Sequence, residues 1–486
     1  MKRLIIRRNA RIFQYLAMIT GNLSIVSSGM HYGWPSPSLP QLQRPNSTFH
    51  VANHEGSWLA AMPLVGAAIG ALMGIALVDR IGRKATILLT ALPFFGAWLA
   101  VGFARAFPVL LLARLVAGIG DGICFCALPI YLNEIAEPEV RGLLGSSCSV
   151  TLVLGMLLIN IVGSYTSIKT AALISSAVPL MLFVTFIWMP ESPYFLTMRG
   201  REAEAAKSLR VFKGVNDVDE DMERISNAIT EQNTETGRFL DLFTVKSNRK
   251  AVLIAMGGRT MQQCSGMLAI SFYAHTIFES AGSSVSSSMT SIIYFAVQLL
   301  MCIVSSALVD RTGRRPLLVF SLIGAGIALF IEGTYFYLQS DHPSLDVSRY
   351  SYVPIVVLFA FVIMYSVGLQ TVPVLLLGEL FPTNVKAFAL SLVDINFSLV
   401  ATAVSKFFQA VKDHYGMHIP FFSFGVACVV GLVFVICCVP ETKGKTLEEI
   451  QEELKGSTAN DTRQVESLRR VAVATIDICS SPRERF

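Results

Sequence analysis

The sequence Asp79-Arg-Ile-Gly-Arg-Lys84 stands directly after one long apolar run, and Asp310-Arg-Thr-Gly-Arg-Arg315 stands directly after another. In each stretch an Asp precedes an Arg by four residues, one helical turn, and a Gly between them turns the chain into the next apolar run. Two nearly identical stretches at corresponding places indicate an internal duplication. In an apolar chain such a duplication is typical of a transporter built from two related helical bundles.

Other charged features also occur once in each half. A Glu precedes a basic residue by seven positions, and a Pro-Glu pair follows the sixth apolar run of each half: Glu134 with Arg141, Glu379 with Lys386, Pro190-Glu191 and Pro440-Glu441. Seven residues make two helical turns, but Pro138 favours a helix break, so that Glu134 and Arg141 could instead join neighbouring helices. At the membrane edge these charges could latch the bundles closed and release them as the bundles rock. The alternative is passive surface pairing, which contributes little stability; the duplication favours the latch.

The composition indicates an integral membrane protein. Of 486 residues, 53% are hydrophobic and only 15% are charged, whereas soluble domains average about a quarter charged residues. Runs of about 20 apolar residues, long enough to cross a bilayer, recur along nearly the whole chain. They lie near 12–33, 57–78, 86–104, 107–131, 145–166, 170–189, 251–278, 287–309, 316–338, 352–377, 387–411 and 418–439. We therefore predict an all-α membrane fold of twelve spans in two six-helix halves.

The charges predict the orientation in the membrane. Lys and Arg gather before the first span, in the turns at 80–84 and 311–315, in the middle segment and in the tail, while the opposite loops carry few. The positive-inside rule then places both termini in the cytoplasm, and we expect a multi-pass plasma-membrane protein. The outward loop 35–56 contains the sequon Asn46-Ser-Thr, a candidate glycosylation site. The nine cysteines avoid the outward loops, which favours small apolar packing roles over disulfides.

The polar stretches divide the chain. We predict an N-terminal bundle over 1–190, an intracellular helical linker over 191–250, a C-terminal bundle over 251–440 and a cytoplasmic tail over 441–486. Within the linker, 201–210 and 218–225 have the pattern of short amphipathic helices. They could be a solvated connection, or they could brace the two bundles from below. The tail begins with a predicted helix over 445–454.

The repeated stretches and several other motifs resemble the sugar-porter family of the major facilitator superfamily, and most closely its insect trehalose-transporter branch. The motifs are Asp79–Lys84, Arg114 with Gly118, Pro129–Glu134 with Arg141-Gly142, Pro190–Pro193, Gln262-Gln263, Asp310–Arg315, Gly378–Phe381, Pro440–Gly444 and Gly33–Leu39. The resemblance covers roughly residues 12 to 455 and implies the twelve-helix major facilitator fold, with its two six-helix halves around a central cavity. It implies that charged residues close the cytoplasmic side in the outward-facing state: Arg83, Glu134, Arg141, Asp310, Arg314, Glu379 and Lys386, with Asp79, Glu191 and Glu441 beside them.

The resemblance also implies a sugar site. Gln262 and Gln263 of the seventh span match the principal hydroxyl ligands, and Gln298 of the eighth span keeps an amide where Asn is usual. Other positions depart from the family pattern, because Ser149 replaces a Gln and Val374 replaces the stacking Trp. In addition, Leu268 stands where the family usually has an Asn. Phe397-Ser398 stands where the family has Asn-Trp, and Asn396 lies one position before this pair.

Three ionisable residues lie inside the predicted spans, and two of them, His31 and Asp394, have more than one interpretation. His31 lies where proton-coupled porters carry an Asp; it could titrate during transport or be a hydrogen-bonded histidine at the outer mouth. Asp121 is seven residues from Arg114 on the same helix face, which predicts an ion pair. Asp394 has no obvious local partner and could serve substrate or proton, or bond a neighbouring helix.

The predicted function is facilitated transport of a small sugar, a hexose or a trehalose-like disaccharide, by a monomer. The alternatives are a proton-coupled sugar or polyol porter and a transport-deficient nutrient receptor. The sequence contains no phosphate-binding Gly loop, metal-ligand cluster or nucleophile motif. We therefore predict no enzymatic activity, no catalytic residue, no cofactor and no metal.

Overall fold

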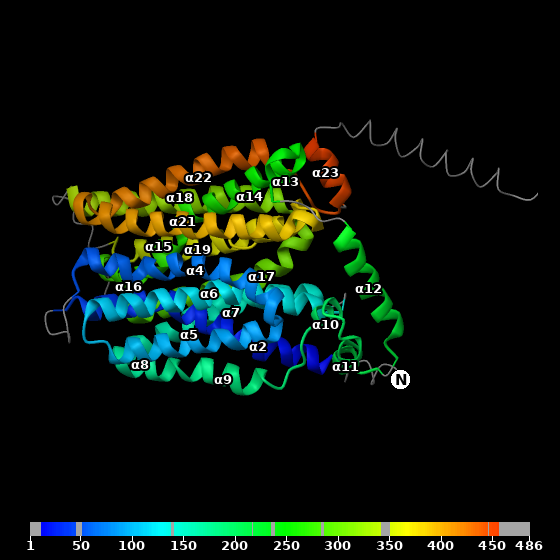
Figure 1. Ribbon diagram of the computed structural model, residues 1–486. Coiled ribbons are helices and arrows are strands. Elements are labelled where there is room, and N and C mark those ends of the chain that lie inside the picture. The colour runs from blue at the N-terminus through cyan, green and yellow to red at the C-terminus, as the bar shows by residue number, and fades with distance from the viewer. Residues whose placement is uncertain are drawn as a thin grey trace, which may run out of the picture.

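The computed structural model describes residues 11–44, 51–137, 140–215, 217–234, 239–282, 286–341, 350–445 and 447–455. These residues form helices joined by short connections, with no strand among them, and the long helices run side by side in one bundle (Figure 1). The first half contains α2 (Ile12–Gly33), α3 (Pro35–Leu42), α4 (Asn53–Ile81), α5 (Arg83–Phe103), α6 (Phe107–Ile135), α7 (Arg141–Tyr165), α8 (Ile168–Ser175) and α9 (Ala177–Phe186). The second half contains α14 (Lys246–Cys264), α15 (Met267–Phe272), α16 (Ala274–Ser280), α17 (Ser287–Thr312), α18 (Arg314–Asp341), α19 (Val353–Val367), α20 (Val372–Leu380), α21 (Thr383–Tyr415) and α22 (His418–Cys438).

Ten segments of the described chain are long and apolar enough to cross a membrane by length and composition. The predicted spans 12–33 and 251–278 are not among them. The first is the single helix α2, which buries several polar side chains, and the second is broken into α14, α15 and α16. Both nevertheless pack inside the bundle, α2 against α6 and α7, and α14 against α21 and α22. They complete the predicted twelve-span arrangement.

Two breaks within spans position the central residues. After α14 the chain turns at Gly266, whose φ of +81° favours glycine, and a Cβ there would lie 2.1 Å from the Phe424 ring. The tenth span breaks between Val367 and Val372. This break frees backbone carbonyls at Leu369 and Gln370 from helical bonding, so that they need partners elsewhere.

Short helices gather at one end of the bundle, which we call the linker end (Figure 1). They are α10 (Pro193–Met198), α11 (Glu202–Lys213), α12 (Asp219–Thr234), α13 (Asp241–Thr244) and α23 (Leu447–Lys455). The predicted helices at 201–210 and 218–225 are thus confirmed as α11 and α12, and the tail helix as α23. Helix α11 packs on α2, where the Gln14 amide donates to the carbonyl of Phe212 at 3.0 Å. Helix α23 packs on α14 and α20.

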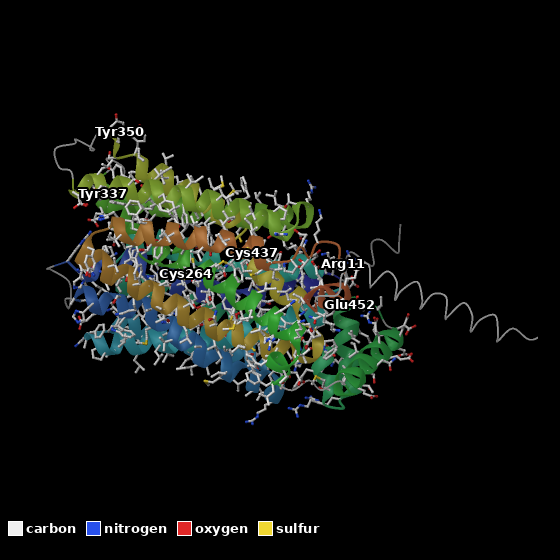
Figure 2. All side chains as sticks on the ribbon, turned by 90° about the horizontal axis from the view of Figure 1, so that it is seen from above. Arg11, Cys264, Tyr337, Tyr350, Cys437 and Glu452 are labelled. Atoms are coloured by element: carbon white, nitrogen blue, oxygen red, sulfur yellow. The ribbon has the colours of Figure 1, made fainter. Side chains whose placement is uncertain are left out.

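The opposite end of the bundle, which we call the far end, carries Tyr337 and Tyr350, whereas Arg11 and Glu452 mark the linker end (Figure 2). The two halves meet where α4 packs on α21 and α7 packs on α17. Helix α3, which follows α2 at the far end, also contacts α15 and α16 of the second half. The domain boundaries at 190, 250 and 440 stay a prediction.

Candidate functional site

The first charged cluster lies at the linker end and is built around Arg83, the first residue of α5. Its side chain is almost fully buried, and its Nε and Nη2 both donate to Glu134 Oε1, at 3.1 and 2.9 Å. Nη1 lies 3.5 Å from Asp79 Oδ1, and the Ser192 hydroxyl donates to the other oxygen of Glu134. In such a buried pair, removing one charge leaves the other unpaired and costs about 3–5 kcal/mol.

The second half repeats this cluster. Arg314, the first residue of α18, donates to Glu379 Oε1 at 2.8 Å, and the Thr442 hydroxyl donates to Glu379 Oε2 at 2.5 Å. Thr442 follows its Pro-Glu pair as Ser192 follows the other one, so the hydroxyl partner is duplicated as well. The side chain of Asp310 lies outside the described residues.

The carboxylates of the two Pro-Glu pairs cap the helices that follow the turns. Glu191 Oε1 accepts the backbone N–H of Lys84 at 2.9 Å, and Glu441 accepts those of Arg314 and Arg315, both at 3.0 Å. A carboxylate at a helix N-terminus also interacts favourably with the helix dipole. Burial acts to raise the pKa of Glu441, but the hydrogen bonds from backbone N–H groups outweigh burial and lower this pKa below its ordinary value.

The predicted latch between the halves stays a prediction. The Arg83–Glu134 and Arg314–Glu379 pairs each lie within one half. Lys386 Nζ donates to the carbonyl of Gly378 at 2.9 Å, again within its own half. The side chain of Arg141 lies outside the described residues. The ion pairs Arg83–Glu134 and Arg314–Glu379 and the Lys386 bond therefore stabilise each half at the linker end, and none of these three described contacts joins the two halves.

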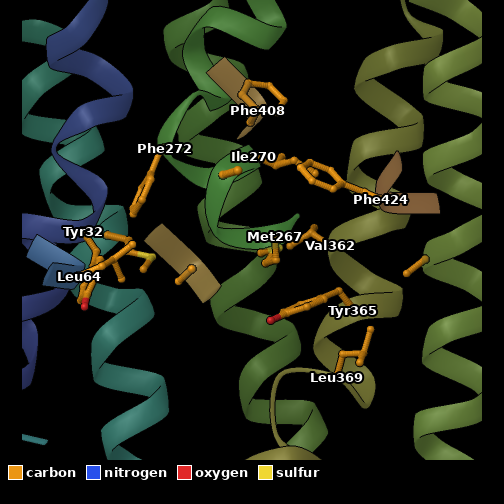
Figure 3. Packing of buried hydrophobic residues seen from close by; sticks show 14 of the residues in the cluster. Tyr32, Leu64, Met267, Ile270, Phe272, Val362, Tyr365, Leu369, Phe408 and Phe424 are labelled. Carbon is orange, nitrogen blue, oxygen red and sulfur yellow. The ribbon is translucent and has the colours of Figure 1, made fainter. Parts of the chain in front are cut away.

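Side-chain contacts that do join the halves lie toward the far end. The rings of Tyr32 (α2) and Phe272 (α15) stack with centroids 6.3 Å apart and planes 3° apart (Figure 3). Lys406 Nζ of α21 donates to the Ser57 hydroxyl of α4 at 2.7 Å and lies 4.1 Å from the centroid of the Trp58 ring. The halves are thus closed against each other at the far end.

Gln262, the first expected sugar ligand, is already bonded by the protein. Its Oε1 accepts from Arg259 Nη1 at 2.8 Å. Its Nε2 donates to the carbonyls of Leu369 and Gln370, at 2.9 and 3.1 Å, which the break in the tenth span has freed. Gln262 therefore links α14 to the connection between α19 and α20.

Arg259 also binds Asp394. Its Nη2 lies 3.2 Å from Asp394 Oδ1, and its guanidinium lies 4.3 Å from the centroid of the Phe397 ring. Of the two interpretations of Asp394, this contact provides the bond to a neighbouring helix. The Asp394 side chain is still 43% exposed.

Gln263 and Gln298 have a different environment. They are 4% and 5% exposed, and within the described part of the chain neither Oε1 has a hydrogen-bond partner. Buried acceptors without partners are rare, because they lose hydration without compensation. Asn396, by contrast, donates to the Thr260 hydroxyl at 3.1 Å and ties α21 to α14. Ser149 lies half-buried on α7.

The histidine prediction needs correction. His31 does not lie at an open outer mouth, because it is only 2% exposed. Its ring stacks on Trp98, with centroids 3.9 Å apart, and on Phe94 of the same helix, α5. This aromatic packing holds the His31 ring against α5 within the first half, and its part in a sugar site stays a prediction.

The predicted ion pair between Arg114 and Asp121 is not formed between these two described residues. Arg114 donates instead to the carbonyls of Leu59 and His31, at 2.9 and 2.6 Å. Asp121 accepts from the Ser28 hydroxyl and, at 2.7 Å, from the Tyr32 hydroxyl. Seven residues of helix separate the two side chains by about 10 Å along the axis, so partners on neighbouring helices lie nearer.

A model of the sugar (and other) transporter family matches residues 16–454. The chain belongs to this family. Its members are transporters, not enzymes, and the chain is a multi-pass membrane protein.

Curated relatives agree with this family. The chain is 36% identical over 449 residues to the facilitated trehalose transporter Tret1 of Polypedilum vanderplanki, covering 91% of this chain and 88% of that one. It is 35% identical to Tret1 of Bombyx mori, with 91% and 86% covered. It is also 35% identical to Tret1 of Anopheles gambiae, but the match covers only 56% of that longer protein.

Solved structures share the fold. The inward open xylose transporter XylE from E. coli matches with a TM-score of 0.75 at 22% identity, over 90% of this chain and 99% of that one. The proton:xylose symporter XylE bound to 6-bromo-6-deoxy-D-glucose matches with a TM-score of 0.72 at 22% identity, over 92% and 99%. Both are major facilitator proteins, which confirms the predicted fold class.

Sequence reasoning missed Arg259 and Lys406. Each is a basic residue inside an apolar run, and a charge within a span is by itself a reason to expect a functional contact. Arg259 also precedes Gln262 by three residues, which places the two side chains on one helix face. Tyr32 and Ser28 gave no comparable signal, because their partner Asp121 belongs to a helix far away in the sequence.

Proposed function

We propose that this transporter carries a small sugar, a hexose or a trehalose-like disaccharide, down its gradient by alternating access. The proposal rests on one observation in a member of a sugar transporter family: within the described chain, the buried acceptors Gln263 Oε1 and Gln298 Oε1 have no hydrogen-bond partner. Sugar hydroxyls are donors that could satisfy both oxygens, and a few convergent polar groups are what orient a ligand in such a site. The names of the relatives favour trehalose among the candidates.

Uptake measurements test this function. Radiolabelled trehalose and glucose are offered to oocytes that express the chain or its variants. We expect uptake by the unaltered chain and a KM raised about fivefold to tenfold in Gln263→Leu and Gln298→Leu, because each variant loses one hydrogen bond between uncharged groups, of about 1 to 1.5 kcal/mol. Gln339→Leu, at the far end of α18, is the matched control. Absence of uptake for both sugars contradicts the proposal, and binding without uptake identifies a nutrient receptor.

A proton-coupled porter is the second candidate. The observation in its favour is that the side chain of Asp394, an acid inside a membrane span, is still 43% exposed although Arg259 contacts it. Protonation of a carboxylate between two moving halves is a common means of coupling in transporters. A protonophore at clamped pH separates the candidates, since it leaves facilitated uptake unchanged and collapses accumulation by a symporter.

We further propose that the linker end faces the cytoplasm, that both termini lie there, and that the chain works as a monomer in the plasma membrane. The excess of Lys and Arg near the termini and in the linker supports this orientation. Asn46, outside the described residues, then lies on the exterior. Glycosidase treatment that shifts the mass of the unaltered chain but not of Asn46→Gln tests both the site and the orientation.

A further inference from the structure

One guanidinium bridges an expected sugar ligand and a membrane-embedded acid. Arg259 gives Nη1 to Gln262 and Nη2 to Asp394, and its Nε is buried without a partner among the described residues. The side chain is only 12% exposed. The Phe397 ring beneath the guanidinium confines it further. Arg259 is therefore held between α14 and α21.

The three amides expected to bind sugar are not equally free. Gln263 and Gln298 each have an Oε1 without a hydrogen-bond partner among the described residues. Gln262 has no such oxygen, because Arg259 occupies its Oε1 and the carbonyls of Leu369 and Gln370 occupy its Nε2. Oε1 has a second lone pair, but the charged guanidinium already draws on this oxygen and fills the space beside it, so a substrate hydroxyl binds Gln262 more strongly once Arg259 has moved away. Arg259 thus competes with substrate for this position.

We propose that Arg259 is a specificity-determining residue that occupies Gln262 in place of a substrate hydroxyl, and that Asp394 retains the guanidinium when substrate displaces it. The planar fork of an arginine can transfer one N–H between acceptors while another stays bonded. Because Asp394 is 43% exposed, it has room to accept a second N–H. The cation stays neutralised throughout, so displacement leaves no unpaired buried charge.

The arrangement also defines the chemistry of the cargo. The charge of Arg259 is already balanced by Asp394, so an anionic ligand meets no unpaired cation there. Among the described residues, the groups without a hydrogen-bond partner on Gln263, Gln298 and Arg259 are two amide oxygens and one guanidinium N–H. A neutral polyhydroxylated ligand supplies both the donors and the acceptor that these groups require. The inference rests on the proposed sugar transport and deepens it.

Equilibrium binding of radiolabelled trehalose and of glucose to the purified full chain tests the inference. Arg259→Lys keeps the charge beside Asp394 but lacks the fork that reaches two acceptors, so Gln262 is released and affinity rises roughly threefold to tenfold. Asp394→Asn leaves Gln262 as the main acceptor for Arg259, so affinity falls by a similar factor. In an Arg259→Met background, Asp394→Asn changes affinity less than twofold.

The controls make the same changes elsewhere on the same helices. Arg249→Met on α14 and Asp413→Asn on α21 are expected to bind like the unaltered chain. Melting temperature and monodispersity verify folding. If Arg259→Met fails to fold, the inference is still tested by the two single variants, because affinity is expected to rise in Arg259→Lys and to fall in Asp394→Asn. Equal, additive losses of affinity in these two variants indicate a structural ion pair and overturn the inference alone. Failure of the unaltered chain to bind either sugar overturns the proposed function itself.

Discussion

The Tyr32 hydroxyl donates a hydrogen bond to Asp121 Oδ2 at 2.7 Å, while the same ring stacks on Phe272 of the other half. One side chain therefore serves both a buried acid and the contact between the halves. Alternating access requires the far-end contacts to separate. When Phe272 moves away from Tyr32, the stack no longer holds the Tyr32 ring in place. The Tyr32 hydroxyl can then move away from Asp121, and their hydrogen bond can break.

Tyr32→Phe separates these two roles. The variant keeps the ring stack but leaves one oxygen of Asp121 without its donor, which costs about 1–3 kcal/mol for a buried group. We expect a lower melting temperature in detergent. Tyr165→Phe, at an exposed position, provides the control and is expected to melt like the unaltered chain. Equal melting of all three proteins contradicts the assignment of this bond.

Lys406→Met is expected to open the far end. It removes the hydrogen bond to Ser57 and the contact with Trp58, each of about 1 kcal/mol, so the open population increases about thirtyfold. Spin labels are attached at His54 and Tyr415, exposed positions at the far ends of α4 and α21, after Cys437, Cys438 and Cys479 have been replaced. Double electron–electron resonance then measures the distance between the two labels.

The control for this measurement is Lys412→Met. The contacts of Lys412 are with Asp413 and Tyr273 of its own half. In Lys412→Met, the distribution of distances between the two labels is expected to match that of the unaltered chain. A shift of similar size in both variants means that general loss of positive charge, rather than the contact with Ser57 and Trp58, controls the opening.

Gly82→Ala tests the turn inside the repeated motif. Gly82 has a φ of +100°, and an added Cβ would lie 2.4 Å from Glu191 Oε2. A non-glycine residue in this region costs about 1–3 kcal/mol before the clash is counted. We expect clear destabilisation in a thermal melt. Gly96→Ala, within α5 and with no atom within 4 Å of the added Cβ, is expected to be neutral or stabilising.

The lowered pKa of Glu441 predicts that part of the folding stability is lost in acid. Because its pKa is lowered by folding, it contributes stability above the unfolded value, about 4.3, and this stability is lost as pH falls through the folded value. Melting temperatures of the unaltered chain and of Glu441→Gln are compared across pH. We expect a constant difference between pH 7.5 and about 5 that narrows below about pH 4.3. A difference that widens in acid has the wrong sign and excludes this role.

Local sequence determined the repeated clusters. An Asp stands four residues before an Arg in both repeated stretches, so a contact between Asp79 and Arg83 could be predicted without a structure, although Gly82 ends the helix between them and the contact spans the turn. The hydroxyl partners Ser192 and Thr442 could have been found as well, since each follows a Pro-Glu pair. Their role became visible only when Glu134 and Glu379 were placed beside them.

The bundle itself was also determined by the sequence, because an apolar run of about 20 residues has few alternatives to a membrane helix. Only the tertiary structure decided the partners of the buried charges. Asp121 bonds Tyr32 rather than Arg114, and Asp394 bonds Arg259 of another helix. Spacing along one helix defines which face a side chain occupies, but the groups across from that face come from helices distant in the chain. The choice of partner is therefore a property of helix packing, which no single span encodes.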